Sequence, residues 1–196
     1  ELARPEHPRP QFVRDAWLNL NGSWQFEYDD NNAGLSDNWA ASARPFTRKI
    51  TVPFCPESPL SGIGDTSFHP WVWYRRTFQA PTDWKGKRVV VHFGAVDYRA
   101  QVWVNGKLAG AHEGGHVPFQ FEITGLLLLA VGGGLGGWVG VRGGLSRGEG
   151  GEGDRTAILP VADSHSECLH RGGHQGDIAL AREHLQAVPE VRAHHC

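Results

Sequence analysis

The sequence predicts an all-β fold, a sandwich of two β-sheets, from three observations. Apolar and polar residues alternate in short runs such as Val89–Phe93 and Ala100–Val104, which is the spacing of strands with one buried face. Asn105-Gly106 follows the second run, and this dipeptide accepts the positive φ angles of a tight hairpin. The alternation resumes at Phe119–Ile123. Short strands at regular intervals are typical of sandwiches and jelly rolls.

The same pattern places the individual strands. Trp24, Trp73 and Trp103 lie inside predicted strands, and we expect at least two of them to pack in the core. Arg75 and Arg76 are neighbours on a strand and therefore face opposite sides. One of them is expected to point inward and to pair with a carboxylate. The strands are expected near Gly22–Asp29, Phe46–Val52, Trp71–Phe78, Lys87–Ala95, Tyr98–Val104, Lys107–His112 and Pro118–Thr124.

Composition narrows the possible functions. The chain has 196 residues and a formal net charge of −2, so nothing in its charge indicates binding to nucleic acid or to an anionic membrane. Its apolar runs are shorter than the roughly 20 residues that a membrane-spanning helix needs. Three widely spaced cysteines, Cys55, Cys168 and Cys196, do not form a disulfide framework and favour a reducing compartment such as the cytoplasm. Cys55 is expected to be a buried apolar filler.

The composition changes after Gly125, which we take as a domain boundary between residues 1–125 and 126–196. Every Phe, Tyr and Lys precedes Gly125, and Gly makes up about half of residues 132–153. A Gly/Arg/His-rich tail of this kind offers little apolar surface, so it is expected to be largely disordered. Two segments are exceptions: Leu135–Val141 is a candidate strand, and Asp177–Val188 has apolar residues near helical spacing.

The tail has two interpretations. It is either the out-of-frame translation of a GC-rich gene or a genuine low-complexity segment. It contains a group of potential metal ligands, His165, Cys168, His170 and His174. Their spacing matches no zinc pattern, so no metal site is predicted.

Several motifs in one order carry a resemblance to a known family. They are WLNLNGSWQFEYD at Trp17–Asp29, ITVPFCPESPLSGIG at Ile50–Gly64, VWYRRTFQAP at Val72–Pro81 and GAVDYRAQVWVNGKLAGAHEGGHVPFQFEIT at Gly94–Thr124. Residues 8–125 resemble the N-terminal sugar-binding domain of glycoside hydrolase family 2, which includes β-galactosidases, β-glucuronidases and β-mannosidases. Separate motifs in a shared order are more specific than any one of them.

The resemblance implies a jelly-roll sandwich of the galactose-binding-domain type. It also implies that the chain is the N-terminal domain fragment of a β-galactosidase-like enzyme that hydrolyses O-glycosyl bonds and needs no cofactor. In this family two Glu residues on a (β/α)8 barrel act on the glycosidic bond. That barrel and the preceding immunoglobulin-like domain are not recognisable in this sequence, so no catalytic residue is assigned and the downstream domains are expected as missing partners. Oligomeric state is not predicted.

Two loops are candidates for contact with a β-glycoside. In the first, two glycines between His112-Glu113 and His116 let the backbone approach a ligand, while the imidazoles and the carboxylate offer hydrogen-bonding groups. The resemblance implies that this loop faces the active-site side of the domain. Glu57, in a rigid loop rich in Pro and Gly, is the second candidate. The alternative is structural: His112 and Glu113 pin their turn, and Glu57 bonds its own loop.

The other acidic residues do not form a convincing catalytic pair. Glu27, Asp29 and Asp30 follow one strand and are interpreted as a solvated edge. Asp97 is expected to have a turn role, and Arg99 is its candidate ionic partner.

Three functional interpretations remain open. The chain is a domain of a family 2 glycosidase, a stand-alone carbohydrate-binding module, or a non-functional product whose incomplete sandwich exposes a sheet edge.

Overall fold

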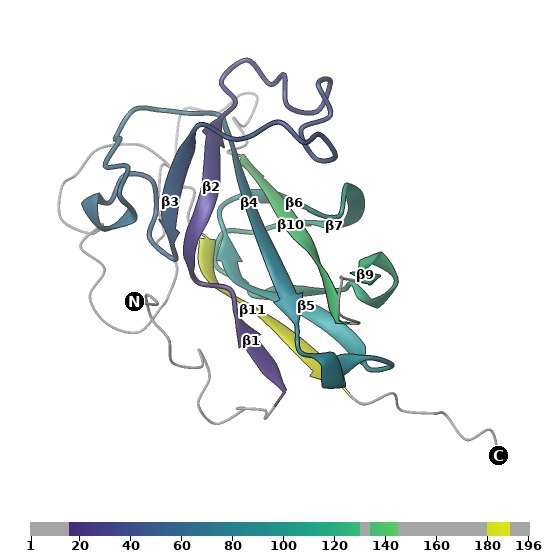
Figure 1. The fold of residues 1–196 in the computed structure, drawn as a ribbon. Helices are drawn as coiled ribbons and strands as arrows, with labels where there is room; N and C mark the ends of the chain where they lie inside the picture. Colours follow the sequence, from purple (N-terminus) through teal and green to yellow (C-terminus); the bar gives the residue numbers. More distant parts are fainter. Residues whose placement is uncertain (1–15, 130–133, 145–179, 189–196) are drawn as a thin grey trace.

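The computed structural model describes residues 16–129 and 134–144 and the backbone of 180–188 as two antiparallel sheets packed face to face. One sheet has the order β3-β2-β4-β10-β6-β7, with β9 added beside β10, and the other has the order β1-β11-β5-β8. Figure 1 shows β11 and β5 crossing behind β2 and β4. The predicted all-β sandwich is confirmed. In the described part of the chain no helix is long and apolar enough to cross a membrane.

The strands have the following bounds: β1 Trp17–Asn19, β2 Gly22–Tyr28, β3 Arg48–Val52, β4 Trp71–Ala80, β5 Arg88–Val96, β6 Arg99–Val104, β7 Lys107–Glu113, β8 Phe119–Glu122, β9 Leu128–Leu129, β10 Leu135–Gly144 and β11 Leu180–Val188. Within the described residues, short 3-10 turns lie between strands at η2 Pro59–Ser61, η3 Thr82–Trp84 and η4 Thr124–Leu126. Asn105 and Gly106, both with positive φ, make the tight turn between β6 and β7, as the sequence predicts.

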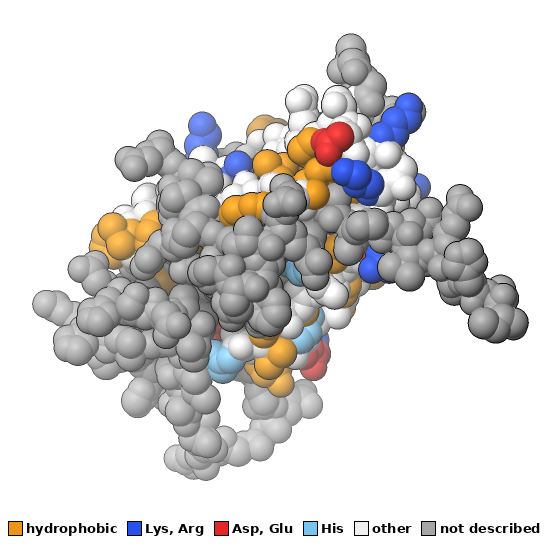
Figure 2. Space-filling model, turned by 90° about the horizontal axis from the view of Figure 1, so that it is seen from below, with side chains coloured by type: hydrophobic (Ala, Val, Ile, Leu, Met, Phe, Trp, Pro, Cys, Tyr) orange, Lys and Arg blue, Asp and Glu red, His pale blue; other side chains and the backbone are white. Residues whose placement is uncertain are grey.

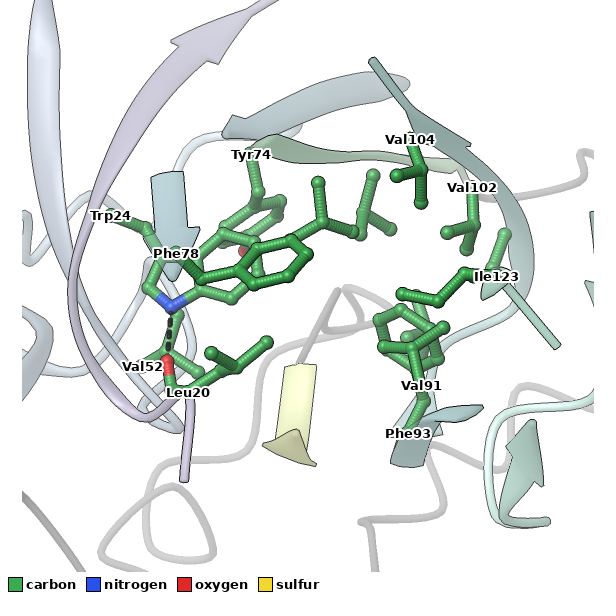
Figure 3. Packing of buried hydrophobic residues seen from close by; sticks show 14 of the residues in the cluster. Leu20, Trp24, Val52, Tyr74, Phe78, Val91, Phe93, Val102, Val104 and Ile123 are labelled. Carbon is green, nitrogen blue, oxygen red and sulfur yellow. Dashed lines mark hydrogen bonds between the residues drawn. The ribbon is translucent and has the colours of Figure 1, made fainter. Parts of the chain in front are cut away.

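The main core lies between the two sheets and is formed by the alternate residues of each strand. Figure 3 shows Trp24, Tyr74 and Phe78 of the larger sheet facing Leu20, with Val91 and Phe93 of β5 beside Ile123. The indole N–H of Trp24 donates to the carbonyl of Leu20 at 2.7 Å, so its polar atom is satisfied inside the core.

A second, smaller aromatic cluster covers the outer face of the larger sheet. It consists of Trp39, Ala40, Phe46, Trp73 and Trp103, all buried. The Trp73 and Trp103 rings stack at 5.1 Å between centroids. With Trp24 in the main core, all three strand tryptophans are buried, which confirms their predicted packing role. The segment between β2 and β3 therefore lies against the sheet.

Asp29 is buried, which makes the prediction of a solvated edge wrong. Its side chain is 2% exposed in the folded chain. The carboxylate accepts hydrogen bonds from the backbone N–H of Ala33 at 2.7 Å, from that of Gly34 at 3.0 Å and from Trp73 Nε1 at 2.9 Å. Arg142 Nε lies 3.9 Å away. A buried carboxylate is tolerated when donors surround it in this way.

Glu27 is the second residue of this group that the structure places inside, at 7% exposure. It accepts from the backbone N–H of Thr47 at 2.9 Å and forms an ion pair with Arg48 at 3.4 Å. Sequence patterning missed both carboxylates because part of their surroundings, Trp73 at Asp29 and Thr47 at Glu27, comes from residues that are distant along the chain.

Arg75 is the buried member of the arginine pair, but it lies on the outer face of the larger sheet beneath the covering segment, and it donates to backbone carbonyls where a carboxylate was predicted. It donates to the carbonyls of Arg44, at 2.8 Å, and of Trp39. Its guanidinium also lies over the rings of Phe46 at 4.2 Å and Trp138 at 5.0 Å. Arg75 thus fastens the covering segment to β4.

The sandwich continues beyond the predicted boundary at Gly125. The candidate strand at Leu135–Val141 is confirmed as part of β10, which lies between β4 and β6. The predicted helix at Asp177–Val188 is wrong: Leu180–Val188 forms β11, paired with β1 and β5. Strand pairing satisfies backbone groups on both sides, whereas a short isolated helix is marginal in water. The predicted disorder and the group His165, Cys168, His170 and His174 fall outside the described residues.

Replacing Ile123 with alanine should destabilise the sandwich. Ile123 is fully buried between the sheets, so the truncation leaves a cavity and should lower the free energy of unfolding by about 2–5 kcal/mol. Urea unfolding followed by tryptophan fluorescence measures this change. Leu128→Ala is the control, because Leu128 is 61% exposed and its truncation should change stability by less than about 0.5 kcal/mol. Equal losses in the two variants would contradict the assigned core.

Candidate functional site

One end of the larger sheet gathers the polar residues that the sequence singles out. The strand register pairs Tyr28 at the end of β2 with Val72 near the start of β4, and Trp71 with Gly144 at the end of β10. It then pairs Gly144 with Arg99 at the start of β6, and Arg99 with Glu113 at the end of β7. These strand ends form a continuous edge, which we call the rim. The end of β2 and the start of β4 lie at the top of Figure 1, and Figure 2, seen from below, shows histidine and acidic side chains at the surface of the molecule.

At the β7 corner of the rim, residues 112–116 fold over the turn between β5 and β6. The N–H of Gly114, whose φ is 127°, donates to the carbonyl of Tyr98 at 2.8 Å. Gly115 is buried against Asp97: a Cβ placed on it would lie 2.5 Å from Asp97 Oδ1. This is the close approach that the two glycines predicted, but here the backbone approaches another part of the chain. The peptide bond between Asp97 and Tyr98 is cis.

His112 and His116 lie on either side of the glycines. The His112 ring stacks on Phe119 at 4.2 Å between centroids, and Phe119 stacks on Phe93 at 4.8 Å. Within the described residues, His112 Nε2 and His116 Nδ1 are buried atoms without a hydrogen-bond partner. Buried polar atoms of this kind are costly unless a water or a ligand satisfies them.

Glu113 forms an ion pair with Arg99. Its Oε1 lies 2.6 Å from Arg99 Nε and 2.5 Å from Arg99 Nη2. Asp97, the predicted partner of Arg99, instead lies against Gly115. Both members of the pair are about half exposed, so the pair contributes little to stability. Its geometry holds a carboxylate and a guanidinium at the surface beside Tyr98, which is 43% exposed.

Glu57 lies apart from these three residues. It belongs to the connection between β3 and β4, and its charge acts on Tyr28 at the β2 corner of the rim. Three strands, β4, β10 and β6, separate β2 from β7 in the sheet. The structure therefore unites His112, Glu113 and His116 and leaves Glu57 in a second group.

Sequence reasoning missed two neighbours of residues 112–116. Phe119 supports the His112 ring, and Asp97 supports Gly115. The first had a local signal, an aromatic residue three positions after His116. The contact between Asp97 and Gly115 had no such local signal, because it joins two different loops. In the described part of the chain no three His, Cys, Asp or Glu side chains are arranged to hold a metal ion.

Comparison with known proteins supports the resemblance found in the sequence. The family model for the sugar binding domain of glycosyl hydrolases family 2 matches residues 62–132. The β-glucuronidase of Paenibacillus borealis is 34% identical over 123 residues, which are 60% of this chain and 20% of that protein. The β-galactosidase of Thermoanaerobacter pseudethanolicus is 30% identical over 113 residues, 55% of this chain and 13% of that protein.

This chain contains a sugar-binding domain of glycoside hydrolase family 2. The solved β-glucuronidase of Lactobacillus rhamnosus shares the fold, with a TM-score of 0.61 and 26% identity, covering 91% of this chain and 30% of that one. The chain therefore spans a fifth or less of the curated relatives described above and about a third of the solved structure.

The family 2 match includes the β7 corner of the rim. His112, Glu113 and His116 lie inside residues 62–132, as do Asp97 and Arg99, whereas Glu57 lies before the match. The corner is thus part of the sugar-binding domain as the family defines it.

Substituting Gly115 with alanine should destabilise the β7 corner. The backbone of Gly115 does not have a positive φ, so the obstacle is the Asp97 side chain, 2.5 Å from the added Cβ. We expect a loss of about 1–3 kcal/mol in the free energy of unfolding, typical of overpacking. The matched control is Gly125→Ala, where the new Cβ meets nothing within 4 Å. Thermal unfolding of both variants measures the difference, and a Gly115→Ala protein as stable as the control would contradict this packing.

Proposed function

We propose that this chain is the sugar-binding domain of a family 2 β-glycosidase that hydrolyses O-glycosyl bonds in β-glucuronides or β-galactosides. The observation that carries the proposal is the identity of 30–35% to enzymes named β-glucuronidase and β-galactosidase over more than half of this chain. Catalysis is assigned to the parts of those proteins that this chain does not match, because the family resemblance places the catalytic carboxylates on a barrel.

The proposed sugar contact is the β7 corner. His112 and His116 present buried ring nitrogens without a partner among the described residues. Glu113 presents a half-exposed carboxylate held by Arg99. Sugar hydroxyls both donate and accept hydrogen bonds, so they complement neutral imidazoles and a carboxylate together. Glu57 is a separate candidate because it lies on the other side of the rim.

A second candidate function is a stand-alone carbohydrate-binding module. Two observations favour it: β10 completes the larger sheet between β4 and β6, and Tyr98 exposes an aromatic ring beside residues 112–116. Sugar rings pack on such surfaces through their apolar C–H faces.

A chimeric enzyme tests the glycosidase proposal. Residues 16–188 of this chain, which include β11, would replace the homologous segment of the Paenibacillus borealis β-glucuronidase. We expect a folded chimera that retains measurable hydrolysis of p-nitrophenyl β-D-glucuronide, because the two segments share the fold and a third of their residues. The unmodified enzyme is the reference for thermal stability. A chimera that unfolds at the same temperature but lacks all activity would contradict the proposal.

Saturation-transfer NMR on the full chain tests the sugar contact. Methyl β-D-galactoside and methyl β-D-glucuronide serve as probes. We expect saturation transfer to ring protons, reduced at least twofold in Glu113→Gln because the charged acceptor is lost. Glu122→Gln is the matched control, since Glu122 is also half exposed and pairs with an arginine, Arg88, at 3.8 Å. Equal signals in the two variants would argue against the β7 corner, and binding by the isolated chain would favour the stand-alone module.

A further inference from the structure

A histidine is held between two carboxylates at the β2 corner of the rim. His69 Nδ1 lies 2.8 Å from Asp30 Oδ1, and His69 Nε2 lies 3.4 Å from Asp65 Oδ2. Asp30 is the second residue after the end of β2, while His69 and Asp65 belong to the connection between β3 and β4. The His69 side chain is 17% exposed. The contact with Asp30 therefore joins this long connection to the end of β2, and the contact with Asp65 closes a turn within the connection.

An aromatic ring sets the orientation of the histidine. The His69 ring stacks on Tyr28 with 3.6 Å between centroids and 18° between planes. The guanidinium of Arg48 lies 4.8 Å from the centroid of the same tyrosine. Burial, and after it the Asp65 carboxylate, raises the pKa of Tyr28 above its ordinary value, with Glu57 acting in the same direction. Tyr28 is therefore neutral at physiological pH and serves as a fixed platform.

The ionisation of Asp65 is secured by its own turn. The backbone N–H of Ser67 donates to Asp65 Oδ1 at 2.9 Å. This hydrogen bond, followed by the Ser67 side chain and then His69, lowers the pKa of Asp65 to about 2. The carboxylate that faces His69 Nε2 is consequently charged at any pH near neutrality.

The protonation state of His69 decides how many of these contacts are hydrogen bonds. A neutral imidazole has one N–H donor and one acceptor nitrogen, and an ionised carboxylate only accepts. A neutral ring can thus donate to Asp30 or to Asp65, whereas an imidazolium donates to both. We propose that His69 is a proton-operated latch, which fastens the connection between β3 and β4 to the end of β2 when protonated and loosens it when neutral.

The direction of the effect follows from the charges that surround the ring. Asp30 and Asp65 face the His69 ring directly. The charges of Arg48 and Glu57 act on Tyr28, the ring on which His69 stacks. The attachment is complete while the imidazole carries its proton. It weakens when the imidazole loses its proton, because the neutral ring then donates to only one of the two carboxylates.

Hydrogen exchange of the full chain tests the latch. Exchange of amides in residues 54–69 is measured by mass spectrometry at pH 5.5 and pH 8.0 and divided by the intrinsic rate at each pH. We expect the protection of this segment to fall by roughly threefold to fivefold between the two pH values, corresponding to one ion-paired hydrogen bond. In His69→Gln, whose neutral amide is the same at both pH values, this difference should disappear.

Two further variants make the result decisive. His92→Gln, on β5 in the other sheet, should keep the pH response of the unsubstituted chain. Asp65→Asn preserves the shape of the side chain and removes one carboxylate, so it should reduce the pH dependence of protection. If His69→Gln fails to fold, as shown by loss of protection in β4 and β5, Asp65→Asn takes its place in the test. A protection that does not change with pH would overturn the proposal. So would an equal response in the original chain and in His69→Gln or Asp65→Asn.

Discussion

The larger sheet depends on β10, because β4 and β6 have no hydrogen bonds to each other and both pair with β10 along most of its length. Without it, two long strands would present unpaired N–H and C=O groups in the middle of the sandwich, which costs free energy comparable to losing those bonds. Val139 and Val141 of the same strand are fully buried and fill the core between the sheets. β10 therefore supplies the backbone hydrogen bonds that connect β4 to β6 and part of the core packing. Its register with these two strands also sets the position of the rim.

A buried polar network holds the covering layer to this sheet. Asp29 hydrogen-bonds to the turn that follows β2 and to Trp73 of β4. Arg142 of β10, the strand on the other side of β4, also lies close to Asp29. Burial lowers the pKa of Arg142 to about 10, against the opposing effect of Asp29, so its guanidinium is charged at neutral pH. Removing one member of such a group leaves an uncompensated buried charge, which is far more costly than losing a surface pair. The covering segment is fixed in place for this reason, and with it the β2 corner of the rim.

The β7 corner and the β2 corner of the rim differ in how far the local sequence could predict which residues meet there. His112, Glu113 and His116 are close in sequence, so any fold that makes a loop there brings them together. Asp30, Asp65 and His69 meet only because β2 and β4 are paired and the connection between β3 and β4 returns to their common end. For the same reason Arg99 was assigned to its neighbour Asp97, although the β6–β7 register sets it opposite Glu113.

By itself, the sequence determined the fold class, most of the strands, the Asn105-Gly106 turn and the family, because alternation and turn chemistry are local properties and the motifs occur in one order. Only the tertiary structure decided that Asp29 and Glu27 are buried, that Arg75 bonds backbone carbonyls, that the candidate strand at Leu135–Val141 lies between β4 and β6 in the sandwich, and that Leu180–Val188 is a strand. A glycine-rich segment such as Leu135–Gly144 carries a weak strand signal. Its conformation is imposed by two neighbouring strands whose backbone groups need a partner, and that requirement is visible only when the sheet is assembled.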